Sequence, residues 1–173
     1  MKTLEQIGLN VLREHLIKNW MTHDGMWFFH CVQAIGIEET NRINKAAIRS
    51  LAAIEIKRAL KLFAIDMESI TTFEALKSMI DAAFSVSKGD FMRFTYTFPE
   101  KNVMHWEWPG KDCFAYQGMQ RLGILDRYEC GVLYRVQCWI ENLGVHYSIS
   151  PEIKGCLMHT SGRCSGDVRF ALP

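Results

Sequence analysis

The chain has 173 residues, of which 49% are hydrophobic and 12% aromatic, a composition typical of one globular domain with a sizeable core. Its 20 basic and 19 acidic residues leave a formal net charge of +1, which favours neither nucleic acid nor a membrane as a partner. No apolar stretch approaches the roughly 20 residues of a membrane-spanning helix. Charged residues interrupt the N-terminus where an export signal would be apolar. We therefore expect a single cytoplasmic domain over residues 1–173.

Residues 1–87 show a helical period throughout. Apolar side chains recur at helical spacing and predict helices over about residues 4–20, 25–35, 38–63 and 71–84. Gly36 is a stop signal for the second helix, and Thr71-x-x-Glu74 forms a capping box for the fourth. We expect these helices to form one layer of the domain.

The hydrophobic period changes to two near residue 88. The segments "FMRFTYTF" and "VMHWEW" alternate apolar and polar residues, which predicts strands over about 91–98 and 103–108. Pairing Tyr96 with Trp106 puts both apolar sets on one face. Two helical segments and a terminal hairpin of strands at 156–160 and 163–171 would follow. The predicted fold is α+β: N-terminal helices packed on a four-stranded antiparallel sheet, with the order β-β-α-α-β-β in a mixed layer over residues 88–173.

The terminal hairpin contains the first candidate site. Turns of two or four residues both place His159 opposite Cys164 on the inner face of the hairpin. A thiol beside an imidazole can act as a nucleophile with its base, or the two can ligate a metal. Gly166 would leave space for a ligand next to them. The alternative is that Cys164 is a small core residue and His159 bonds a backbone carbonyl.

A second candidate site lies in the segment "HDGMWFFHC". Helical spacing puts His23, Trp27 and His30 on one stripe, which can form the wall of a site for a flat ligand. The alternative, which is favoured, is that the stripe is an aromatic helix face packed into the core.

The third candidate is the helical stripe in "YECGVLYRVQCWIE", where Cys130, Tyr134 and Gln137 can line a pocket or lie on a half-exposed surface. Six cysteines occur without a CxxC pair, so buried structural thiols are favoured over a four-cysteine metal site. No cofactor is indicated.

The runs "YECGVLYRVQCWIENLGV", "GCLMHTSGRCSGDVRFAL" and "HDGMWFFHCVQAIGIEETNRIN" resemble a family of small bacterial cytosolic proteins. That family is distantly similar to L-2-amino-thiazoline-4-carboxylate hydrolase-like and vinyl-reductase-type ligand-binding proteins. The resemblance implies an α+β domain whose late cysteines, Cys130, Cys156 and Cys164, sit near a ligand pocket. No motif in this chain fixes hydrolytic chemistry, so the resemblance implies no activity.

Two functions are therefore considered. In the first, the protein is a cytosolic sensor or carrier that binds a small molecule in a Cys/His-lined pocket with aromatic walls that include Trp27, Trp106, Tyr134 and Trp139. In the second, it is a hydrolase-like enzyme that uses Cys164 and His159 as nucleophile and base or as metal ligands. The sequence lacks the motifs of nucleotide binding, serine hydrolases and metalloproteases. Besides the small-molecule ligand, a second copy of the chain stays open as a partner.

Overall fold

A computed structural model describes residues 3–173. The elements in chain order are η1 (Leu4–Gln6), α1 (Leu9–Ile35), α2 (Ile37–Leu62), η2 (Met67–Ser69), α3 (Phe73–Ser87), β1 (Thr95–Glu100), β2 (Val103–Trp108), α4 (Phe114–Arg121), α5 (Gly131–Asn142), β3 (Tyr147–Ser150), α6 (Leu157–Thr160) and β4 (Cys164–Phe170). The molecule is therefore an α+β protein with helices first and an antiparallel sheet later, as predicted. Among residues 3–173, no helix combines the length and apolar character needed to cross a membrane.

The first long helix, α1, is continuous over 27 residues, so the prediction of two helices was wrong. Gly25 lies in its interior, with no other atom within 4 Å of the position that a Cβ would occupy. One glycine costs a helix only about 1 kcal/mol, and burial of Ile17 and Phe28 on either side offsets it. The helix ends at Gly36, whose φ of 79° only glycine adopts easily and whose N–H bonds Val32 O.

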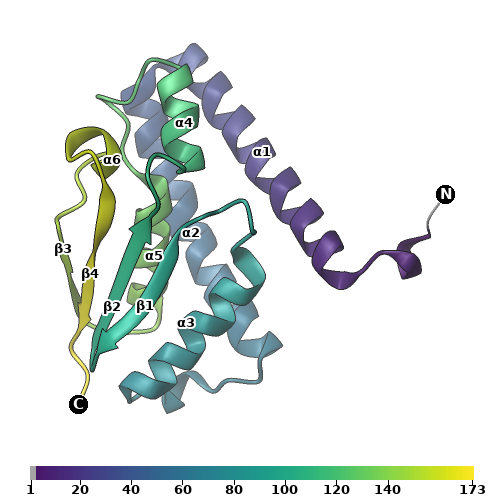
Figure 1. Cartoon of the computed structure of the whole chain (residues 1–173), viewed down its shortest axis with the longest axis vertical. Helices are drawn as coiled ribbons and strands as arrows, with labels where there is room; N and C mark the ends of the chain where they lie inside the picture. The colour runs from purple at the N-terminus through teal and green to yellow at the C-terminus, as the bar shows by residue number, and fades with distance from the viewer. Residues whose placement is uncertain (1–2) are drawn as a thin grey trace.

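Helix α2 lies at the centre of the helical part of the molecule. It packs against α1 and α3 and, most extensively, against α5 from the second half of the chain. Figure 1 shows α1 running along the edge of the molecule, with its N-terminal end projecting away from the body. Helix α3 begins after Thr72, whose hydroxyl accepts a bond from Ala75 N at 3.3 Å, one residue beyond the predicted cap. The sheet and α2 are thus tied together through α5.

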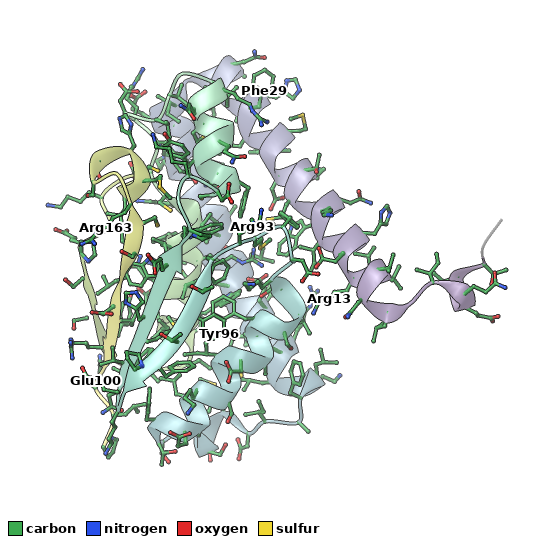
Figure 2. The ribbon with its side chains drawn as sticks, in the orientation of Figure 1. Arg13, Phe29, Arg93, Tyr96, Glu100 and Arg163 are labelled. Carbon is green, nitrogen blue, oxygen red and sulfur yellow. The ribbon has the colours of Figure 1, made fainter. Side chains whose placement is uncertain are left out.

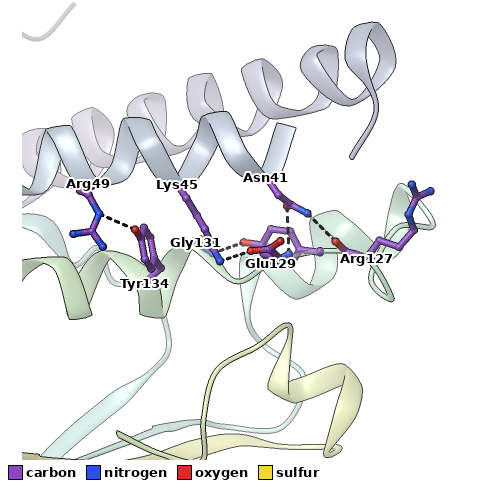
Figure 3. Close-up of polar contacts among 8 residues, drawn as sticks. Asn41, Lys45, Arg49, Arg127, Glu129, Gly131 and Tyr134 are labelled. Carbon is purple, nitrogen blue, oxygen red and sulfur yellow. Dashed lines mark hydrogen bonds and ion pairs between the residues drawn. The ribbon is translucent and has the colours of Figure 1, made fainter. Parts of the chain in front are cut away.

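The contact between α2 and α5 is polar near the N-terminal ends of both helices (Figure 3). Asn41 is only 3% exposed, and its Nδ2 donates to Arg127 O at 2.8 Å while its Oδ1 accepts from Glu129 N at 3.3 Å. Lys45 forms an ion pair with Glu129. One buried amide therefore satisfies two backbone groups of the segment that leads into α5.

The sheet has the strand order β1-β2-β4-β3, and every pair is antiparallel. Tyr96 pairs with Trp106, as predicted from the alternation of apolar residues. Along β2 and β4, Trp106 faces Gly166 and Trp108 faces Cys164. Apolar side chains therefore cover one face of the sheet, and the helices pack on that face (Figure 1). The other face is polar, with His105 and Asp167 joined across two strands at 2.7 Å.

The predicted terminal hairpin is wrong. Residues 157–160 form the short helix α6, and the partner of β4 on this side is β3, a strand that the sequence analysis missed. A segment of four residues is too short for its hydrophobic period to distinguish a helix from a strand. Tyr147-Ser148-Ile149-Ser150 does alternate between half-buried and exposed positions, so a signal for β3 was present in the sequence.

Candidate functional site

The predicted pair of His159 and Cys164 does not exist. His159 lies on α6 and is exposed, whereas Cys164 is buried on β4 opposite Trp108. The proposed space beside Gly166 is also filled, because a Cβ at this position would lie 2.5 Å from the Cη2 atom of Trp106. The indole of Trp106 lies against the glycine and takes up the room that was assigned to a ligand.

The chemistry of Cys164 is that of a core thiol. Burial raises its pKa to about 12, and the nearby Trp106 indole N–H only partly opposes that rise. The two groups do not reach hydrogen-bond geometry, so the Trp106 Nε1 atom is buried without a partner. Because the thiolate is the nucleophilic form, a thiol that stays protonated at neutral pH reacts slowly.

Tyr128 lies among three cysteines, Cys113, Cys130 and Cys156, and Cys164 lies near these thiols. Cys113, Cys130 and Cys156 are the N-cap residues of α4, α5 and α6, and their thiols lie near enough to one another to interact electrostatically, as Cys130 does with Cys164. Burial also raises the pKa of Cys130 to about 12. Within residues 3–173, no group of three or more His, Cys, Asp or Glu side chains is placed to hold a metal ion. Cys113, Cys130 and Cys164, whose pKa values are raised by burial, are therefore weak nucleophiles at neutral pH.

The stripe of α5 does not line one pocket. The hydroxyl of Tyr134 accepts a bond from Arg49 Nε at 3.0 Å, which ties it to α2 (Figure 3). Gln137 Oε1 instead accepts from Tyr147 OH at 3.3 Å and belongs to the side of α5 that faces the sheet. Cys130, at the N-cap of α5, belongs to the thiol cluster.

A small inner cavity lies between the apolar face of the sheet and α5, and its volume is about 30 Å³. Two predicted ligand-binding residues, Trp106 and Gln137, are in its wall together with Tyr96. Figure 2 shows Tyr96 between β1 and α3, where its hydroxyl donates to Asp81 Oδ1 at 2.9 Å. This space holds about one water-sized group, so a larger ligand would have to displace the aromatic wall.

A wider groove lies among the helices and has a volume of about 520 Å³. We call it the helical groove; its lining residues are Leu16, Ile17 and Trp20 of α1, Leu51, Glu55, Ile56, Arg58, Ala59 and Leu62 of α2, Ala83, Val86 and Ser87 of α3, and Trp139 of α5. Most of these side chains are apolar. Of the residues predicted to bind a ligand, only Trp139 contributes to this groove.

One end of the helical groove carries a compact polar cluster. Arg135 Nε donates to Glu55 Oε2 at 2.9 Å, and Trp139 Nε1 donates to the same oxygen at 2.8 Å. The Arg135 guanidinium lies 4.4 Å from the centre of the Trp20 ring, so it joins α5 to both α1 and α2. Nearby on α1, burial raises the pKa of Asp24, and its contacts with His23 and Arg135 only partly lower it.

Arg58 differs from Arg135, the other arginine of this region, because it forms no ion pair with the described residues. It lines the groove and is exposed, whereas the arginine ion pairs within residues 3–173 involve other positions. Glu55, the other charged lining residue, is already neutralised by Arg135. The groove therefore combines apolar walls with one uncompensated positive charge at its edge.

His23, Trp27 and His30 lie together, as predicted, but on the surface. They border a shallow hollow that is lined by residues of α1 alone, and all three are exposed. The expected alternative, an aromatic stripe packed into the core, is wrong because Ile17 and Phe28 face the core instead. The predicted ligand-binding residues are thus divided among separate surfaces.

The protein is thus of the α+β class, with an antiparallel sheet that helices cover on one face and a groove among those helices. Residues 3–90 match a protein family of unknown function, DUF6125, and the chain belongs to this family. No curated protein and no solved structure matches the chain. The matched segment contains α1, α2 and α3, and thus all of the helical groove except Trp139.

The sequence analysis missed three residues that shape the groove. Trp20, Glu55 and Arg58 were interpreted only as parts of amphipathic helices, or not singled out. A weak signal was present in the sequence, because Trp20 is a large aromatic residue that directly follows two polar residues in the segment "KNW". The arrival of Trp139 from α5, 84 residues beyond Glu55, could not be derived from local spacing.

Proposed function

We propose that this protein binds a small, largely apolar molecule with an anionic end in the helical groove, as a sensor or carrier that breaks no bond in its ligand. The observation that carries the proposal is a groove of about 520 Å³ with apolar walls and a free arginine at its edge. Small-molecule sites have volumes of about 300–1,000 Å³ and combine apolar walls with a few polar groups.

The walls support an elongated apolar ligand. Ile56, Ala59 and Ala83 are at most 7% exposed and form the deep part of the groove, whereas Leu16 and Leu62 are 58% and 66% exposed at its edge. A ligand that covered these leucines would remove apolar surface from water, which contributes roughly 25 cal/mol per Å².

The charges support an anionic end on the ligand. Arg58 offers five N–H donors in a planar arrangement that suits a carboxylate. Because Glu55 is neutralised by Arg135, the net charge of the lining favours an anion over a cation. No comparable observation favours the hydrolase alternative, since the Cys164 thiol is buried and is not paired with His159.

The proposal is tested by titrating the protein with laurate, below its micelle concentration, while tryptophan fluorescence is recorded. Trp20 and Trp139 line the groove, so we expect a saturable change in fluorescence. The Arg58→Glu substitution should weaken laurate binding roughly fivefold or more, because it removes a rim-exposed ion pair worth up to about 1 kcal/mol and places a like charge beside the carboxylate.

Lys57→Glu is the matched control, since Lys57 is the exposed neighbour of Arg58 and does not line the groove. It makes the same change in charge and should leave the affinity unchanged. The cationic probe dodecyltrimethylammonium should show the opposite preference and bind the Arg58→Glu variant better than the original protein. Equal weakening by both substitutions, or no saturable response to laurate, would contradict the proposal.

A further inference from the structure

We infer that a second copy of this chain packs along an exposed stripe of α1 and forms a two-fold symmetric homodimer. The α1 stripe consists of Leu9, Leu16, Trp20, His23, Trp27, His30 and Ala34. From Leu16 onward its members are separated alternately by four and three residues, which is the spacing at which two helices pack side by side. Leu16 and Trp20 also line the helical groove, so the dimer would border that groove, but the inference rests on the exposed face of α1 and is tested without ligand.

Except for Trp20, which is half-buried, the members of the stripe are open to water although several of them are apolar. Leu9 is 82% exposed, Leu16 58% and Trp27 54%. Met26 beside the stripe is 54% exposed, and Ile35 at the end of the helix is 46% exposed. Scattered apolar residues are normal on a surface, but a continuous row of them along one helix marks an interaction site.

Charge is missing from the same part of α1. From Asn19 to Ile35, the only formally charged side chain is Asp24. A helix face that meets water usually carries charged residues, so this surface has the composition of a buried one. The stripes of two copies can therefore pack against each other without bringing rows of like charges together.

The hollow on α1 identifies the shape of the partner. It is lined by His23, Met26, Trp27, His30 and their neighbours on this one helix. Residues three and four apart on one helix form the hole that receives a side chain from a facing helix. The facing helix must carry the same spacing in an exposed position, and α1 of a second copy meets this requirement. A contact between identical patches closes as a two-fold dimer.

The available area is sufficient for a dimer. A helix of 27 residues is about 40 Å long, and α1 runs along the edge of the molecule with its N-terminal end clear of the body (Figure 1). Leu9, Leu16, Met26, Trp27 and Ile35 each expose on the order of 100 Å², given that a large aromatic side chain buries about 150–250 Å² in full. Two copies would thus bury roughly 1,000 Å², about the minimum for a biological interface and typical of a weak dimer.

Sedimentation equilibrium tests the inference. The original protein should have twice the 20.0 kDa mass of one chain at micromolar concentration. Trp27→Glu should give a monomer, with the dissociation constant raised by about 30-fold or more, because a central tryptophan contributes about 2 kcal/mol or more to an interface. Circular dichroism establishes that the variant is folded, and Met26→Lys provides a second variant should Trp27→Glu fail to fold.

Val11→Glu is the matched control. Val11 lies on the same helix and is 64% exposed, but it is not a member of the stripe. This variant should remain a dimer with an unchanged dissociation constant. The inference is overturned by an original protein that is monomeric at 100 μM, by a folded Trp27→Glu variant that stays dimeric, or by equal effects of Trp27→Glu and Val11→Glu.

Discussion

Gly166 determines how closely the strands and the loop after β3 approach one another. A Cβ at this position would lie 2.3 Å from Ser150 O and 2.5 Å from Trp106 Cη2. The first of these atoms belongs to the backbone, so it cannot give way by a change of rotamer. The glycine is therefore a packing requirement, and the same contact explains why no ligand space exists beside it.

We expect Gly166→Ala to destabilise the protein by about 3 kcal/mol or more, because an added methyl group must displace backbone and a buried indole. Gly118→Ala is the control, since Gly118 lies within α4 with no other atom within 4 Å of the Cβ position. It should stabilise the protein by about 0.5–1 kcal/mol. Urea unfolding measures both, and equal stability of the two variants would contradict this account.

At the scale of single residues, the sequence allowed pairings within a strand ladder to be predicted but not side-chain neighbours from distant elements. Tyr96 opposite Trp106 followed from alternation alone. The pairing of His159 with Cys164 failed because it depended on a strand that is a helix. Arg58 and Trp139 meet in one groove only because α5 packs on α2, which no local pattern encodes.

The contact between α2 and α5 joins the helical half of the chain to the mixed half. Asn41 is 3% exposed and satisfies one backbone carbonyl and one backbone N–H. Arg49, two turns further along α2, reaches Tyr134 and Glu141 at 3.0 Å each. The amide contributes more than the exposed ion pair, because its two hydrogen bonds are part-buried and its removal leaves two backbone groups without their side-chain partner.

Asn41→Ala should lower the free energy of unfolding by about 2 kcal/mol, since it leaves two part-buried backbone groups without their side-chain partner. Asn44→Ala is the comparison: Asn44 lies on the same helix and is half-buried, and its substitution should cost less than about 1 kcal/mol. Chemical denaturation measures the difference. A loss for Asn41→Ala no greater than that for Asn44→Ala would refute the role assigned to Asn41.

At the scale of elements, the sequence predicted most of the fold. The change of period near residue 88 located β1 and β2 and separated the helical half from the mixed half. Two predictions were wrong: Gly25 was treated as a helix boundary, and residues 156–160 were treated as a strand. Both relied on the local sequence alone, whereas tertiary packing decides the structure of these segments. Packing of Phe28 in the core keeps α1 continuous.

The thiols give the whole molecule a dependence on alkaline pH. Burial raises the pKa values of Cys130 and Cys164 from 9.0 to about 12. In the unfolded chain these thiols ionise near pH 9, whereas in the folded protein they stay protonated. The stabilising contribution is therefore complete below about pH 9 and is lost as the pH rises toward 12.

Urea unfolding at pH 7, 9 and 10.5 should show a free energy of unfolding that falls above pH 9. Other groups also titrate in this range, so the double variant Cys130→Ala and Cys164→Ala serves as the control and should have a shallower slope. The same slope in the variant and in the original protein would show that the two thiols do not cause the loss.

The distance along the chain between α2 and its main partner affects how the protein folds during synthesis. Lys45 and Glu129, which join the two helices, are 84 residues apart. At a rate of about 5–20 residues per second, the ribosome needs roughly 4–17 s to add that interval. For this time the side of α2 that α5 will cover has no partner, and the nascent helical half exposes an apolar surface. The core of the protein is therefore completed only after α5 emerges.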